Sequence, residues 1–195
     1  MHKEGAARRC SSGRVTAMTD LVLIATPQEA AHLPSSVHVE LIGIGMVPAA
    51  VATTRAILEH RPSRVVNLGS VGALDPSISG ICRPSAVINR DINADELRAA
   101  GLHIDDRIEL GCNGPVLGSG DSFVAGGPAR DQLLRRCQIV DMEGFAVAHA
   151  CRALGVELLM IKHVSDAADE AAVAWKDLVD RSARALADAY AELSS

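Results

Sequence analysis

Apolar runs alternate with amphipathic stretches along most of the chain. Short apolar runs bounded by Gly, Pro or polar residues predict buried strands at residues 21–25, 37–44, 64–68, 138–140 and 157–164, with shorter ones near 85–89 and 115–118. The strand at 64–68 is expected to end in a loop of small residues at 69–72. Helical spacing predicts helices at residues 48–60, 143–154 and 172–193, and a weak one near 94–100. This alternation predicts an α/β layer fold around a largely parallel sheet.

The composition is that of one globular domain. Of the 195 residues, 48% are hydrophobic and 22% charged, which suits a single core. The net charge of −5 argues against a nucleic-acid surface, and no apolar run approaches the roughly 18 residues of a membrane span. Residues 1–18 are polar and lack periodicity, so we expect a disordered or non-native tail there and one domain over residues 19–195.

Neither a metal nor an organic cofactor is expected. The five cysteines are odd in number and form no Cys-x-x-Cys pair, so they suggest neither disulfides nor a zinc cluster, and a reducing cytoplasm fits best. No spacing of ligand residues suits a metal. The segment from Gly43 through Gly45 to Pro48 follows a strand as a dinucleotide fingerprint does, but Pro48 replaces the third glycine. NAD binding is therefore a weak hypothesis.

Five polar clusters follow apolar runs, where the carboxyl ends of strands gather active-site residues in α/β sheets. They are Glu29, residues 67–72, residues 119–123, residues 141–143, and Ser165 with Asp166. Each also has a purely structural interpretation. Glu29 and Glu143 suit the first turn of a helix, Ser165 or Asp166 suits an N-cap, and residues 118–121 suit a turn.

Together these clusters give the chain a family resemblance. The segments LIGIGMVPAA, GSGDSF, VDMEGFAVA and VSDAAD resemble, in the same order, the methylthioadenosine/S-adenosylhomocysteine nucleosidases and their phosphorylase relatives. The resemblance implies a three-layer fold with a mostly parallel or mixed central sheet flanked by helices. It also implies a small-molecule nucleoside substrate and a homodimer.

The resemblance assigns the three catalytic roles that cleavage of an N-glycosidic bond requires. The reaction passes through a ribosyl cation, as in glycoside hydrolysis. Glu143 matches the carboxylate that binds the ribose hydroxyls, Asp166 the acid that protonates the purine at N7, and Glu29 the carboxylate that holds the attacking water.

The substrate-binding positions follow from the same resemblance. Phe123 matches the ring that stacks on the base, and the backbone of Val124 would bind the edge of the base. The other matching residues contact the ribose, the nucleophile or the 5′ substituent: Met142, Ser70, Gly72, Ser165, Ile44 and Trp175. Gly72 is expected to keep its loop tight, and Trp175 is equally consistent with an ordinary buried helix residue.

The nucleophile separates hydrolases from phosphorylases. Glu29 would repel a phosphate dianion, and Asn67 stands where a phosphorylase carries arginine, so hydrolysis is favoured. A phosphate-dependent phosphorylase and a non-catalytic nucleoside-binding protein stay open as alternatives. The 5′ substituent also stays open, because the chain is shortened between residues 81 and 118 and carries Lys162-His163 in place of the usual Arg-Ala.

Overall fold

The computed structural model describes residues 20–169 and 175–194. The strands of this part are β1 (Asp20–Ile24), β2 (Val39–Leu41), β3 (Arg64–Ala73), β4 (Ile81–Cys82), β5 (Ala86–Asn89), β6 (Arg107–Glu109), β7 (Val116–Ser119), β8 (Ile139–Asp141) and β9 (Glu157–Asp166). Its helices are α1 (Met46–His60), α2 (Ala94–Ala99), α3 (Gly127–Leu133), α4 (Gly144–Leu154) and α5 (Trp175–Ala191), followed by a 3-10 turn at Glu192–Ser194.

The strands form one mixed sheet that contains two parallel blocks, with β4 and β6 added in antiparallel register to β9 and β5. β2, β1, β3 and β9 are parallel to one another, and so are β8, β7 and β5. The blocks join where the last residues of β3 pair with β8 in antiparallel register, Gly72 opposite Val140 and Ala73 opposite Ile139. Because β3 also pairs with β9, its end lies between the ends of β8 and β9.

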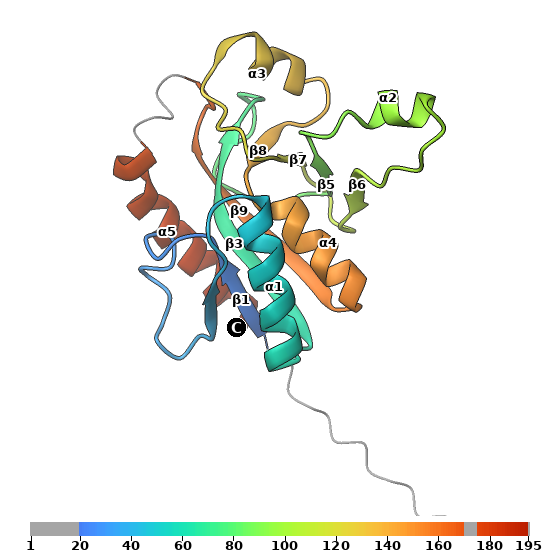
Figure 1. Cartoon of the computed structure of the whole chain (residues 1–195). Coiled ribbons are helices and arrows are strands. Elements are labelled where there is room, and N and C mark those ends of the chain that lie inside the picture. The colour runs from blue at the N-terminus through green and yellow to red at the C-terminus, as the bar shows by residue number, and fades with distance from the viewer. Residues whose placement is uncertain (1–19, 170–174, 195) are drawn as a thin grey trace, which may run out of the picture.

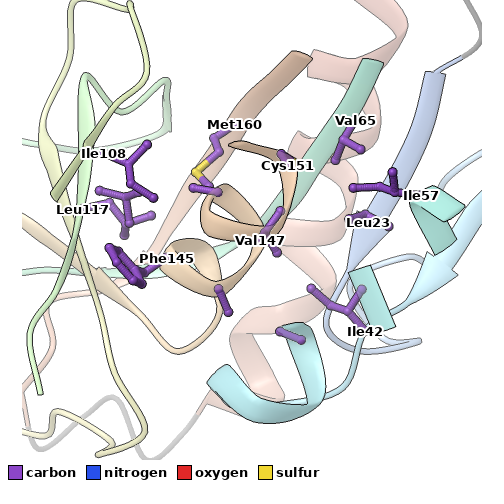
Figure 2. Packing of buried hydrophobic residues seen from close by; sticks show 14 of the residues in the cluster. Leu23, Ile42, Ile57, Val65, Ile108, Leu117, Phe145, Val147, Cys151 and Met160 are labelled. Carbon is purple, nitrogen blue, oxygen red and sulfur yellow. The ribbon is translucent and has the colours of Figure 1, made fainter. Parts of the chain in front are cut away.

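Helices cover both faces of the sheet, as the apolar runs predict for strands buried on both sides (Figure 1). Alternate residues of β1 and β3 point to opposite faces. Leu23 and Val65 pack with α1 and α4, as Figure 2 shows, and Val22 and Val66 pack on the other face with Leu186 of α5. The sequence-predicted layers are therefore present.

Local residues explain where the helices begin and end. Pro48 is the third residue of α1, where its missing N–H costs no helical hydrogen bond. α4 ends at Gly155, whose φ of 68° is the left-handed conformation that glycine adopts without strain.

Several predicted boundaries were wrong. β3 does not end at Leu68: residues 69–73 continue it, because they pair with β9 and β8. The second strand is limited to Val39–Leu41, and β9 runs two residues past the predicted end to Asp166. β4, β6 and α3 were not predicted. The expected tail at 1–18 lies outside the described residues.

No helix in the described part of the chain is both long and apolar enough to cross a membrane.

Candidate active site

A cavity of about 530 Å³ opens where the strand ends of both blocks meet. Its walls come from the ends of β3, β8 and β9, and from segments that follow β1, β2, β5, β7 and β8. Every sequence-predicted site residue except Trp175 lines it: Glu29, Ile44, Ser70, Gly72, Phe123, Val124, Met142, Glu143, Ser165 and Asp166. Trp175 begins α5, but its side chain lies outside the described part of the structure. The chain fold thus brings the predicted clusters into one site.

The Glu29 carboxylate is buried and held by three hydrogen bonds. Ser70 donates to Oε1 from its backbone N–H at 2.8 Å and from its hydroxyl at 2.7 Å, and the Thr26 hydroxyl donates to Oε2 at 3.0 Å. Glu29 lies in a turn, so the alternative of a carboxylate in the first turn of a helix is wrong. Fixed in this way, the carboxylate can orient a small polar molecule beside β3.

Glu143 occupies the N-cap position of α4, but its side chain makes no capping hydrogen bond there. Instead Oε1 accepts a hydrogen bond of 2.8 Å from the N–H of Gly45, at the start of α1. Burial and the nearby charge of Asp141 raise the pKa of Glu143 to about 7, while the Gly45 N–H and Lys162 act in the opposite direction. Glu143 also lines the cavity, and a pKa of about 7 means that its carboxyl group ionises near neutral pH.

At the wall of the cavity, Asp141 forms an ion pair with Lys162 that the sequence did not reveal. Nζ of Lys162 lies 3.0 Å from Oδ2 of Asp141, and both side chains are only 2% exposed. Asp141 also accepts hydrogen bonds from the Ser119 hydroxyl at 2.5 Å and from the N–H of Gly144. The signal was a single lysine inside the apolar run 158–164, because a lysine at such a position requires a buried partner.

The same lysine lies close to Glu29. A side chain at Gly69 would come within 3.3 Å of Lys162 Nζ and 3.8 Å of Glu29 Oε1, so both groups flank this glycine. Glu29, Asp141 and Glu143 are all buried. Three buried carboxylates beside one ammonium group give this side of the site a potential that suits a developing cation.

Asp166 faces the site from the end of β9. Its Oδ1 accepts from the N–H of Ala168 at 2.8 Å, and its Oδ2 accepts from the Ser165 hydroxyl at 2.6 Å. These contacts fix a local turn, and no described helix begins at this point, so the helix N-cap alternative is wrong. Gly72 lies opposite Asp166 in β3, not in a loop as predicted. A Cβ there would lie 2.9 Å from the Cβ of Ala168, so only glycine fits.

The segment after β7 carries Phe123 and Val124. Phe123 is exposed at the mouth of the cavity. Arg90, which the sequence analysis missed, is buried and donates to the carbonyls of Gly120 and Ser122. It thereby holds the loop that presents the phenyl ring. Nothing in the local sequence marks this role, since the acceptors are backbone groups 30 or more positions away.

Asn67 does not line the cavity. Its side-chain amide donates to the carbonyl of Leu23 at 3.1 Å and ties β3 to β1. Asn67 therefore offers no group to a phosphate in the cavity, and the structural argument for water over phosphate rests on Glu29.

The sequence profile of the phosphorylase superfamily matches residues 33–103 and 108–194. The chain is 28% identical to the 5′-methylthioadenosine/S-adenosylhomocysteine nucleosidase of Staphylococcus epidermidis over 167 residues, which cover 72% of this chain and 73% of that relative. It is also 28% identical to the enzyme of the same name from Actinobacillus succinogenes, over 73% of each chain. The family resemblance seen in the four motifs is confirmed.

Solved structures share the fold. The nucleosidase from Neisseria meningitidis, in complex with methylthio-immucillin-A, superposes with a TM-score of 0.78 at 23% identity, over 91% of this chain and 99% of that one. A futalosine hydrolase mutant of Helicobacter pylori gives 0.77 at 20% identity, over 88% and 96%. The predicted α/β fold of three layers is confirmed.

Proposed function

The chain belongs to the phosphorylase superfamily, and we propose that it hydrolyses the N-glycosidic bond of a 5′-substituted adenine nucleoside. The observation that carries the proposal is the convergence of Glu29, Glu143 and Asp166 on one cavity, with Glu29 locked by Ser70. The cavity of about 530 Å³ lies within the roughly 300–1,000 Å³ typical of small-molecule sites. The relatives named for this activity support the same conclusion.

Each acid takes one part of the reaction. The ionised Glu143 accepts hydrogen bonds from the ribose hydroxyls and stabilises the ribosyl cation that forms as the bond from C1′ to the base breaks. Asp166 gives its proton to N7 of the departing purine, so that the base leaves neutral. Water adds to C1′, and Glu29 accepts its proton. The products are the free base and the 5′-substituted ribose.

The remaining residues position the substrate. Phe123 stacks on the base and the backbone of Val124 binds its edge, at the mouth of the cavity. Met142 packs on the ribose beside Glu143, and Ser165 steadies Asp166 through the hydrogen bond already described. Ile44 borders the 5′ substituent, and the same role for Trp175 rests on the family resemblance alone.

Glu29 is the reason for preferring water to phosphate. The side chain is buried, and its carboxylate accepts three hydrogen bonds next to the place where the nucleophile would lie. A phosphate dianion there would be repelled by the negative charge of the carboxylate, whereas water can donate a hydrogen bond to it.

We also propose that the protein is a homodimer. Val47, Val51 and Leu58 lie on one face of α1 and are 70%, 65% and 60% exposed. Ile44 continues this apolar face to the cavity, which it lines while being exposed itself. A second copy covering α1 would bury the face and close the 5′ end of the cavity.

A reducing compartment such as the cytoplasm is part of the proposal. It is supported by the cysteines of the described residues, Cys82, Cys112, Cys137 and Cys151, which are free thiols.

A nucleoside panel tests the function. The purified full chain is incubated with methylthioadenosine, S-adenosylhomocysteine, a futalosine-type nucleoside and adenosine, each with and without phosphate, and the free base is followed by chromatography. We expect base release at the same rate in both buffers. Release that requires phosphate and yields a ribose 1-phosphate would make the protein a phosphorylase. No release from any nucleoside would make it a binding protein.

A further inference from the structure

Two histidines and a glutamate converge at the edge of the sheet, away from the cavity. His38 and Glu40 lie two residues apart at the start of β2, so both side chains point to the same face of that strand. His60 is the last residue of α1, which returns along β2. Among residues 20–169 and 175–194, this is the one group of three metal-ligand side chains whose ligand atoms all lie within 4.8 Å of one another.

Two of the three distances between the ligand atoms match a tetrahedral metal site, and the third is within 4.8 Å. Nε2 of His60 lies 3.1 Å and Nε2 of His38 lies 3.5 Å from the same oxygen, Oε1 of Glu40. With bonds of about 2.0–2.1 Å to zinc, neighbouring ligands of a tetrahedron are about 3.3 Å apart. The two rings meet edge to face with centroids 4.3 Å apart, which leaves both Nε2 atoms near the carboxylate.

The surroundings also favour a cation. The carbonyl groups at the end of α1 carry partial negative charge, and His60 is the residue that ends the helix. His38 is exposed and the other two are partly buried, so an ion could enter from solvent and keep water as its fourth ligand.

We propose that His38, Glu40 and His60 bind a divalent transition-metal ion, for which zinc has the best match of ligands and spacing. The ion would clamp the end of α1 onto the edge strand β2. The opposite end of α1, about 22 Å away for a helix of this length, holds Gly45 against Glu143. The site is therefore separate from the chemistry proposed for the cavity.

No metal is expected from the sequence, because no spacing of ligand residues along the chain suits one. His60 follows Glu40 by 20 residues, and only the return of α1 along β2 brings it back.

Calorimetric titration with Zn²⁺ tests the site. The full chain is freed of metal with a chelator, exchanged into chelator-free buffer, and compared with His38→Gln, His60→Gln and the double variant. His32→Gln is the matched control, since His32 hydrogen-bonds Asp180 in a different place. We expect one ion per chain in the wild type and the control, and at least about a hundredfold weaker binding in each test variant, because even outer-shell changes cost 10–100-fold.

Thermal unfolding gives a second readout that does not depend on activity. At free Zn²⁺ about a hundredfold above the dissociation constant, the Tm of the wild type rises by roughly 5–10 °C, and that of the double variant does not. Unchanged zinc affinity in the double variant would overturn the proposal, as would no binding to the wild type. A thiolate-to-metal absorption band after Co²⁺ substitution would also overturn it, because the ion would then lie on cysteines.

Discussion

Asp166 has neighbours that hold its orientation without supplying the proton that the leaving base needs. The Ala168 N–H and the Ser165 hydroxyl both donate to its carboxylate. Asparagine can keep the acceptor for Ala168 but has no acidic proton. We expect Asp166→Asn to lower kcat by about 10²–10⁴-fold with little change in KM, measured by base release at saturating nucleoside. Asp95→Asn, on a fully solvated side chain, should match the wild type. Nearly full activity in Asp166→Asn would remove this residue from the acid role.

Glu143 makes stability and activity depend on pH in opposite ways. Its pKa is raised from 4.5 to about 7 in the folded chain. Between these values the unfolded chain ionises Glu143 and the folded chain does not, so its contribution to stability is full below about 4.5 and is lost as the pH rises to about 7.

Glu143→Gln removes this loss, because glutamine does not ionise and can still accept from Gly45. We expect the Tm of the variant relative to the wild type to be higher at pH 8 than at pH 5. The measurement is thermal unfolding at both values. A relative Tm that is lower at pH 8 would mean that the folded site favours the ionised form. In the wild type, kcat/KM should rise as the pH passes about 7, since ionised Glu143 binds the ribose hydroxyls.

At the scale of elements, the end of β3 joins β8, which leads into Glu143, to β9, which carries Asp166. Gly72 pairs with Val140 of β8 on one side and with Asp166 of β9 on the other. An added Cβ at Gly72 would lie 2.9 Å from Ala168 Cβ and 3.1 Å from Asp166 Oδ1. Any side chain there must therefore push the end of β9 outward.

We predict that Gly72→Ala lowers the free energy of unfolding by about 1–3 kcal/mol through overpacking, and lowers kcat/KM by about a hundredfold by displacing Asp166. Urea unfolding and base release measure the two effects. The control is Gly101→Ala, where φ is +85° and no atom lies within 4 Å. This variant should lower the free energy of unfolding by about 1 kcal/mol, because alanine is strained in the left-handed backbone conformation, and it should keep full activity. Equal activity losses in both variants would show that lowered stability, not displacement, is the cause.

For the whole molecule, the exposed face of α1 predicts assembly. Val51→Glu places a charge in the centre of that face, between Val47 and Leu58. We expect sedimentation to show a dimer for the wild type and a monomer for Val51→Glu. The variant should also have a raised KM for nucleosides with long 5′ substituents, since the second subunit would no longer cover Ile44. Ser36→Glu adds the same charge on an exposed loop and should stay dimeric. A wild-type monomer that retains full activity would contradict the proposed assembly.

The sequence by itself determined the order of the longer elements and the kinds of chemistry they carry, but not the short elements β4, β6 and α3. The spacing of apolar residues and the residues near helix ends, such as Pro48 and Gly155, act over a few positions. They therefore place α1 and α4 within about two residues of their observed bounds. Two of the four motifs likewise contain Glu143 and Asp166, and the wider family resemblance points to Glu29; all three line the cavity. These features depend on local conformation or on residue identity, and both can be read along the chain.

Only the tertiary structure decided how those residues work together. Residues 69–73 have small side chains typical of a loop, yet they are a strand because β8 and β9 satisfy their backbone groups. Three contacts join residues that lie 20 to 41 positions apart: the ion pair of Lys162 with Asp141, the hydrogen bond of Ser70 to Glu29, and the contact of His60 with Glu40. Such contacts form because sheet register and helix packing bring distant groups together, which local pattern does not encode.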